Sequence, residues 1–365
     1  MRRARLALSA AMAALVLSSP ARAQQRVVNV YNWSNYIAPG VLDDFTKETG
    51  IKVVYDTFDA NETLETRLLA GKSGYDVVVP TAYFLQRQIK AKVFQPLDKS
   101  RLPNLANAWP EVTKRLATYD PDNAHAVNYM WGTTGIGYNV KQVRKILGPD
   151  VKIDSWDIVF KPENLARFKD CGVQMLDSAD DILPAALNHL GLDPNSTAQA
   201  DLDKAADLVA AIRPNVRKFH SSEYLNALAT GEICLVVGWS GDIIQARRRA
   251  AEAGNGVEIG YVIPKEGAQM FFDNLAIPAD ANNVSEAYEL INYLYRPDVA
   301  AKNSNFLGYA NGNLASQKLI DAKVAGDKTI YPDDAMLAKL FIITARDQRT
   351  QRVINRLWTK VKTGK

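Results

Sequence analysis

Short apolar runs alternate with amphipathic segments along the first part of the chain. Three runs have the length and the β-branched content of buried strands: VVNVY (27–31), IKVVYD (51–56) and YDVVVP (75–80). The segments between and after them place apolar residues at helical spacing: VLDDFTKET (41–49), NETLETRLLAG (61–71, with Asn61 as the expected cap) and AYFLQRQIKA (82–91). This alternation predicts an α/β fold in which a mostly parallel sheet is flanked by helices.

A second set of the same elements follows in the middle of the chain. Its predicted strands are GVQML (172–176) and CLVVGW (234–239). Its predicted helices cover about 180–190, EYLNALATG (223–231) and DIIQARRRAAEAG (242–254). Two such sets in 365 residues exceed one ordinary core and predict two lobes.

Two extended segments join the sets and are expected to form a hinge. They are WGTTGIGYN (131–139) and VEIGYVIPKEG (257–267). A hinge needs only a few such residues to absorb a rotation between lobes. We therefore expect one lobe from residues 24–131 and 260–306, and the other from residues 132–259 and 307–365.

The first 23 residues have the layout of a secretory signal peptide. Arg2, Arg3 and Arg5 precede an apolar stretch from Leu6 to Leu17, and the small-x-small sequence ARA (21–23) follows it. The apolar stretch is too short to span a bilayer as a mature helix. We expect cleavage after residue 23 and a periplasmic mature protein.

Removal of this segment changes the charge of the chain. The net charge of +4 disappears because residues 1–23 contain four basic residues and no acidic one, leaving 40 of each sign. The basic balance of the full sequence therefore gives no support for nucleic-acid binding.

The two cysteines, Cys171 and Cys234, form an even pair in an exported protein, which favours a disulfide over a metal site or a catalytic thiol. Two separate buried thiols are the alternative. The three histidines are isolated, without metal-ligand spacing. No metal and no cofactor is expected.

The sequence lacks most of the motifs that mark catalytic sites. GTTGIG lacks the dinucleotide-binding spacing, and there is no G-x-S-x-G or H-E-x-x-H motif. His220 stands beside Ser221 and Ser222, a pattern more typical of a helix cap than of a nucleophile with its base. The sequence therefore favours a protein that is not an enzyme.

Aromatic side chains recur beside amides, hydroxyls or acids where apolar runs end. The stretches are YNWSNY (31–36), GWSGD (238–242), MFFDNLAIP (270–278) and LGYANGN (307–313). None contains Lys or Arg, which an anion site would want. Aromatic faces attract cations, and carboxylates complete an ammonium site with charge-assisted hydrogen bonds. These stretches predict a cleft for an organic cation.

The chain from about Val27 to Lys365 resembles the periplasmic polyamine-binding proteins of ABC importers. The resemblance rests on stretches that follow one another in order: YNWSNYIAPG, FTKETGIKVVYDTFDANE, GYDVVVPTA, FQPLDKS, YMWGTTGIGYNV, DSWDIVFKPENL, GWSGD, IPKEGAQMFFDNLAIPADA, INYLYRPDV and WTKVK. It implies a two-lobed type II binding-protein fold, a monomer that closes on a polyamine and delivers it to a membrane permease, and no catalysis. We expect putrescine as the first candidate ligand and spermidine as the second.

Carried over by position, the resemblance also implies a set of ligand contacts: Trp33, Ser34, Tyr36, Asp180, Trp239, Asp242, Phe271, Asp273 and Tyr309. Thr81 and Tyr83 stand where the family often has serines, and Asn35 stands at a position that is usually acidic. The two cysteines fall where putrescine-binding members have a disulfide pair.

Two alternatives remain open from the sequence. An enzyme on the same fold would need a nucleophile or base in the cleft, for which Cys234 is a remote candidate. A binding protein with another cargo would take a different cationic amine or an amino-acid-like ligand.

Overall fold

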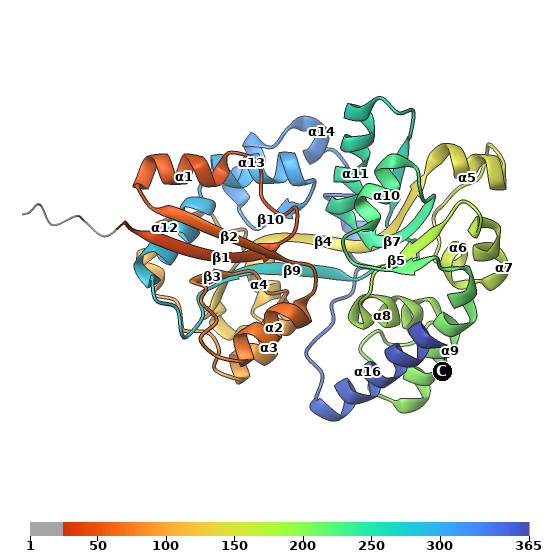
Figure 1. Ribbon diagram of the computed structural model, residues 1–365, viewed down its shortest axis with the longest axis horizontal. Helices are drawn as coiled ribbons and strands as arrows, with labels where there is room; N and C mark the ends of the chain where they lie inside the picture. The colour runs from red at the N-terminus through yellow and green to blue at the C-terminus, as the bar shows by residue number, and fades with distance from the viewer. Residues whose placement is uncertain (1–24, 365) are drawn as a thin grey trace, which may run out of the picture.

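One sheet of ten strands runs through both halves of the protein (Figure 1). The computed structural model describes residues 25–364. The strands are β1 Val27–Trp33, β2 Lys52–Phe58, β3 Val77–Val78, β4 Ala126–Asn139, β5 Val173–Met175, β6 Lys218–Phe219, β7 Leu235–Trp239, β8 Ile259–Val262, β9 Met270–Ala276 and β10 Ala310–Asn311. Their order is β2-β1-β3-β9-β4-β7-β5-β6, and β8 and β10 pair with β4 outside this path.

The first lobe is built on β1, which pairs in parallel with β2 and β3 as the strand–helix alternation predicts. The helices of this lobe are α1 Val41–Thr49, α2 Asn61–Leu69, α3 Ala82–Lys90, α4 Pro110–Leu116, α12 Val284–Leu294 and α13 Pro297–Leu307. Apart from α4, which packs in a separate cluster with Trp131 and Phe272, their apolar faces close a core that includes Val28, Phe45 and Leu64. Gly50, at φ 72°, ends α1 in the left-handed conformation expected of a terminating glycine.

The second lobe repeats this plan around β5, which pairs in parallel with β6 and β7. The helices of this lobe are α5 Val140–Leu147, α6 Asp157–Phe160, α7 Pro162–Leu165, α8 Ala179–His189, α9 Gln199–Ile212, α10 Tyr224–Thr230 and α11 Ser240–Ala253. A separate core, with Trp156, Phe168 and Tyr224 fully buried, holds this lobe together.

The long strand β4 connects the two lobes (Figure 1). Its first part pairs with β9, and its last part pairs with β7 and β8, all antiparallel. The expected extended segment 131–139 lies within this strand and is confirmed. Gly135 has a packing reason, because a Cβ there would lie 2.5 Å from the Tyr261 hydroxyl. The complete sheet is therefore mixed, with parallel strands in each lobe and antiparallel connecting strands.

The last sixty residues do not all pack on the second lobe. β10 pairs with β4 at Trp131, and the 3-10 helix η6 (Leu314–Leu319) packs on α13. The short helices α14 (Ala322–Ala325) and α15 (Asp334–Leu337) follow, and only α16 (Gln348–Thr363) packs on α8 and α9. The division into lobes stays a prediction, and these contacts favour a last boundary near Phe341 rather than at 306.

Among residues 25–364, no helix combines the length and the apolar character that crossing a membrane requires. The signal peptide predicted over residues 1–23 lies outside the described residues.

Candidate functional site

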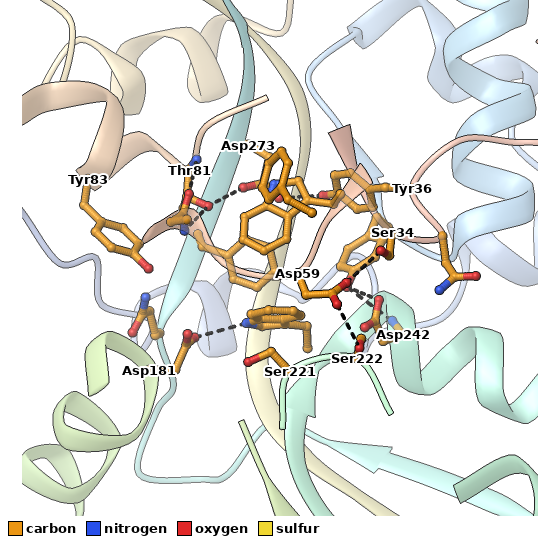
Figure 2. A pocket seen from close by; sticks show the side chains of 18 residues that line it. Ser34, Tyr36, Asp59, Thr81, Tyr83, Asp181, Ser221, Ser222, Asp242 and Asp273 are labelled. Atoms are coloured by element: carbon orange, nitrogen blue, oxygen red, sulfur yellow. Dashed lines mark hydrogen bonds between the residues drawn. The ribbon is translucent and has the colours of Figure 1, made fainter. Parts of the chain in front are cut away.

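A cavity lies between the two lobes, where strands from both end (Figure 2). β1 ends at Trp33 and β7 ends at Trp239, and both side chains line the cavity. This is the place that the sequence predicts, because ligands of open α/β sheets sit beyond the carboxyl ends of strands. Eleven of the twelve residues proposed as ligand contacts line it; their contact with a ligand remains a prediction.

Five aromatic side chains from both lobes form the walls. The Trp33 and Trp239 rings meet across the cleft with centroids 5.5 Å apart and planes at 76°. Tyr36 and Tyr309 meet edge to face at 5.1 Å, and the Phe271 ring lies 6.2 Å from that of Tyr309. The Trp33 indole is fixed by a 2.9 Å hydrogen bond from Nε1 to the carbonyl of Val79. The result is a narrow passage with apolar faces.

Asp273, on β9, is the first buried carboxylate of the cavity. It accepts hydrogen bonds from the Thr81 hydroxyl at 2.6 Å and from the Tyr36 hydroxyl at 2.7 Å. Burial raises the pKa of Asp273 to about 7, although these two donors act in the opposite direction. Asn61 holds Thr81 in place through its amide rather than capping α2, which begins after Ala60 without a side-chain cap.

Asp242, in the first turn of α11, is the second buried carboxylate of the cavity. It accepts hydrogen bonds of 2.8 Å from the hydroxyls of Tyr224 and Tyr309. Burial raises the pKa of Asp242 to about 6, with the same two hydroxyls lowering it. Gly241 makes room for this arrangement, since a Cβ there would lie 2.1 Å from the Tyr309 ring.

The acid that α8 contributes to the cavity is Asp181, not Asp180. Asp181 accepts from the Thr134 hydroxyl at 2.6 Å and from the Trp239 indole at 3.2 Å. Asp180 instead forms a buried ion pair with Arg346 and does not line the cavity. Consecutive helical residues face different directions, so an error of one residue in placing this acid exchanges a lining carboxylate for a structural one.

Asn35 and Tyr83, two of the three positions at which the sequence was expected to depart from the family, occupy opposite surroundings. Asn35 has a positive φ of 56° and accepts a 2.9 Å hydrogen bond from Arg249 of α11, so it links the lobes at the rim. Tyr83 is buried beside the acids of α8 and Glu62, and burial raises the pKa of Tyr83 well above its usual range. Burial likewise raises the pKa of Glu62 to about 7.

Sequence reasoning missed seven lining residues: Phe58, Asp59, Asn61, Asp181, Ser221, Ser222 and Gln269. Phe58 ends β2 and Asp59 follows it, just beyond the strand predicted over 51–56, so the rule that located YNWSNY could have found them. Gln269 carries no comparable signal. The lining as a whole has four carboxylates, Asp59, Asp181, Asp242 and Asp273, and no Lys or Arg.

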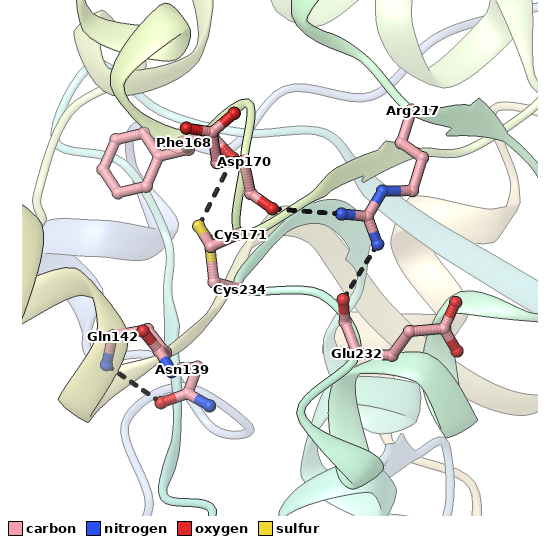
Figure 3. Close-up of a disulfide and its surroundings, with 8 residues drawn as sticks. All are labelled: Asn139, Gln142, Phe168, Asp170, Cys171, Arg217, Glu232 and Cys234. Carbon is pink, nitrogen blue, oxygen red and sulfur yellow. Dashed lines mark hydrogen bonds between the residues drawn. A yellow bond between two sulfur atoms is a disulfide. The ribbon is translucent and has the colours of Figure 1, made fainter.

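The pair Cys171–Cys234 forms a disulfide with Cα atoms 5.6 Å apart, as predicted (Figure 3). It joins the amino ends of β5 and β7, at the far ends of those strands from the cavity. Arg217 ties the same two turns together by donating to the carbonyls of Asp170 and Glu232. Cys234 is therefore not a candidate nucleophile.

His220 holds the turn that precedes α10 rather than capping the helix, whose N-cap position, Glu223, has no side-chain cap bond. Its Nδ1 accepts from the backbone N–H groups of Ser222 at 3.1 Å and Glu223 at 3.2 Å, at the start of α10. In residues 25–364, no group of three or more His, Cys, Asp or Glu side chains is placed to hold a metal ion.

Residues 40–332 match the profile of the bacterial extracellular solute-binding proteins. The chain belongs to this family. This solute-binding protein is 54% identical over 344 residues to the putrescine-binding periplasmic protein PotF of Escherichia coli, covering 94% of this chain and 93% of that one. It is 49% identical to the putrescine-binding periplasmic protein SpuD of Pseudomonas aeruginosa, covering 98% of both chains.

A solved structure supports the type II binding-protein fold. The putative spermidine/putrescine ABC transporter from Listeria monocytogenes is 33% identical to this solute-binding protein. The two superpose with a TM-score of 0.83 over 93% of this chain and 100% of the other.

Proposed function

We propose that this solute-binding protein is a periplasmic receptor that binds putrescine between its lobes and delivers it to an ABC importer. The observation that carries the proposal is the pair of hydroxyl-braced carboxylates, Asp242 and Asp273, inside an aromatic passage without Lys or Arg. Each carboxylate has about four lone-pair sites, so two hydroxyl donors leave acceptor capacity for an ammonium group. The relatives named as putrescine-binding support the same ligand.

The aromatic walls suit the rest of a diamine. Ring faces attract the ammonium ends, contributing about 0.5–2 kcal/mol each, and cover the methylene groups between them. The permease is the partner of this receptor, which acts as a monomer and without catalysis. An amino-acid-like cargo is disfavoured, because its carboxylate would meet four acids and no cationic side chain in the lining.

Spermidine is the second candidate for a specific reason. Tyr83 and Asp181 place a hydroxyl and an acid in the lining at one side of the passage, and the charge of Glu62 acts on Tyr83 from outside the lining. A third amine of a longer chain would find partners there.

Thermal unfolding of residues 24–365 in the presence of separate amines, amino acids and anions tests this proposal. We expect putrescine to raise the melting temperature most and spermidine less, because ligand that binds only the folded state stabilises it. Stabilisation by an amino acid or an anion, with none by either polyamine, would contradict the proposed ligand class.

We also expect putrescine affinity to fall below about pH 6. Burial raises the pKa values of Asp242 and Asp273 to about 6 and about 7. Ligand ammonium groups favour the ionised carboxylates, so binding lowers both pKa values and releases protons in this window. Calorimetry in buffers of different ionisation enthalpy should show proton release near about pH 6.5 and little near about pH 8.5.

The raised pKa values of Asp242 and Asp273 also determine whether the stability of the protein rises or falls with pH. Both carboxyls have folded pKa values above the unfolded value of about 4, so their contribution to the stability of the empty protein is present below about pH 4. It is lost as the pH rises through about 6 and about 7. Stabilisation by putrescine should therefore be larger at about pH 8 than at about pH 5. Equal stabilisation at both would show that these carboxylates do not bind the ligand.

A further inference from the structure

A carboxylate outside the buried pair bridges the lobes at the mouth of the cleft (Figure 2). Asp59 directly follows β2 and is exposed. Its Oδ1 accepts a 2.7 Å hydrogen bond from Ser34 of the first lobe. Its Oδ2 accepts a 3.3 Å hydrogen bond from Ser222, which precedes α10 in the second lobe. The second of these bonds requires the lobes to be together.

The turn that presents Ser222 is held by its own contacts. Nδ1 of His220 accepts the backbone N–H groups of Ser222 and Glu223, and Nε2 of His220 lies 3.2 Å from a carboxylate oxygen of Glu223. The Ser222 hydroxyl therefore reaches Asp59 from a fixed position.

Closure also brings like charges together. The first lobe supplies Asp59 and Asp273 to the cavity, and the second supplies Asp181 and Asp242. The charge of Asp59 contributes to the raised pKa of Asp242, after the larger effect of burial. Arg249, the cation at this rim, donates to the side-chain oxygens of Asn35 and Asn226, and its charge lowers the pKa of Asp242. Among the described lining residues nothing positive lies between the acids of the two lobes.

We infer that Asp59 is a specificity-determining residue, which favours closure on cationic ligands. A ligand ammonium near Asp242 also attracts Asp59, and the closed cleft then gains the Ser34–Asp59–Ser222 bridge. Without a cation, closure leaves Asp59 facing the acids of the second lobe. Position 35 carries an uncharged amide, so the negative charge beside Ser34 and Ser222 comes from Asp59. This inference rests on the proposed function and assigns to Asp59 a role that differs from that of the buried pair.

Two substitutions separate the charge of Asp59 from its bridge. Asp59→Asn removes the charge but keeps one carbonyl oxygen that can accept from Ser34, while its amide N–H can donate to the Ser222 hydroxyl. Ser222→Ala keeps the charge but removes the bond between the lobes. Asp56→Asn is the matched control, because Asp56 lies on β2, three residues before Asp59, and accepts a hydrogen bond from the Tyr75 hydroxyl outside the cavity.

Putrescine affinity of these variants is measured by calorimetry at low and at high salt. We expect Asp59→Asn to bind about tenfold more weakly at low salt, as for one lost charge interaction near the surface. The loss should shrink at about 1 M salt, where charges are screened within about 3 Å. The putrescine affinity of Ser222→Ala should fall about twofold, as for one exposed polar contact. The affinity of Asp56→Asn should not change.

Two outcomes overturn the inference. One is unchanged affinity in Asp59→Asn. The other is a loss in Ser222→Ala that equals the loss in Asp59→Asn and does not depend on salt, because Asp59 would then act only as a hydrogen-bond acceptor. If the unmodified protein binds putrescine in these experiments, the proposed function stands in either case. If it binds no polyamine, the proposed function fails first.

Discussion

Asp242→Asn is expected to weaken putrescine binding by about 2–5 kcal/mol, the usual cost of removing one member of a desolvated charge pair. The substitution keeps the shape of the side chain and one oxygen acceptor, but its amide nitrogen can no longer accept from one of the Tyr224 and Tyr309 hydroxyls. It also removes the negative charge that we propose lies next to the ligand ammonium. Calorimetric titration measures the change.

The control for this variant lies on the same helix. Glu252→Gln removes one negative charge from α11 at a side chain that is 66% exposed and pairs with Arg248 outside the cavity. Its affinity should stay that of the unmodified protein. An Asp242→Asn variant that binds as tightly as this control would remove Asp242 from the site.

Replacement of both Cys171 and Cys234 by Ala is expected to lower the free energy of unfolding by roughly 4 kcal/mol. The estimate follows from the entropy of a cross-link between residues 63 positions apart. Chemical denaturation measures it, with the unmodified protein under reducing conditions as a second route to the same loss. Because the disulfide joins the amino ends of β5 and β7, away from Trp239, putrescine affinity should change little. An unchanged denaturation midpoint would show that the cross-link does not stabilise the second lobe.

The elements of both lobes could be predicted from the sequence because their signals are local. VVNVY and CLVVGW are apolar runs of strand length, and Gly50 and Gly254 end helices in left-handed conformations. The joining of these elements into one sheet could not be predicted. It depends on β4, which pairs with different strands along its length.

The site was predictable where an aromatic or acidic residue lies at the end of a strand or just beyond it. Trp33 ends β1, Trp239 ends β7, and Asp242 lies three residues after Trp239; all three line the cavity. The position of Asp180 could not be predicted from the sequence. Only the rotation of α8 decides that Asp181 faces the cleft while Asp180 pairs with Arg346, a residue far along the chain.

Long-range contacts account for the other differences between the predicted site and the observed site. Asp59 became a candidate only when the structure placed Ser222, more than 160 residues away, beside it. Asn61 has the residue type and position of a helix cap, but its amide bonds Thr81 instead. In both cases the sequence shows the chemical group but not its partner.

Calorimetric titration of the unmodified protein, residues 24–365, with putrescine tests the central claim most directly. The account predicts one site per chain with a dissociation constant in the micromolar range or below, about −8 kcal/mol or better. Binding should be accompanied by proton release near about pH 6.5, as the raised pKa values of Asp242 and Asp273 require. Absence of binding by putrescine and by spermidine below millimolar concentration would contradict it.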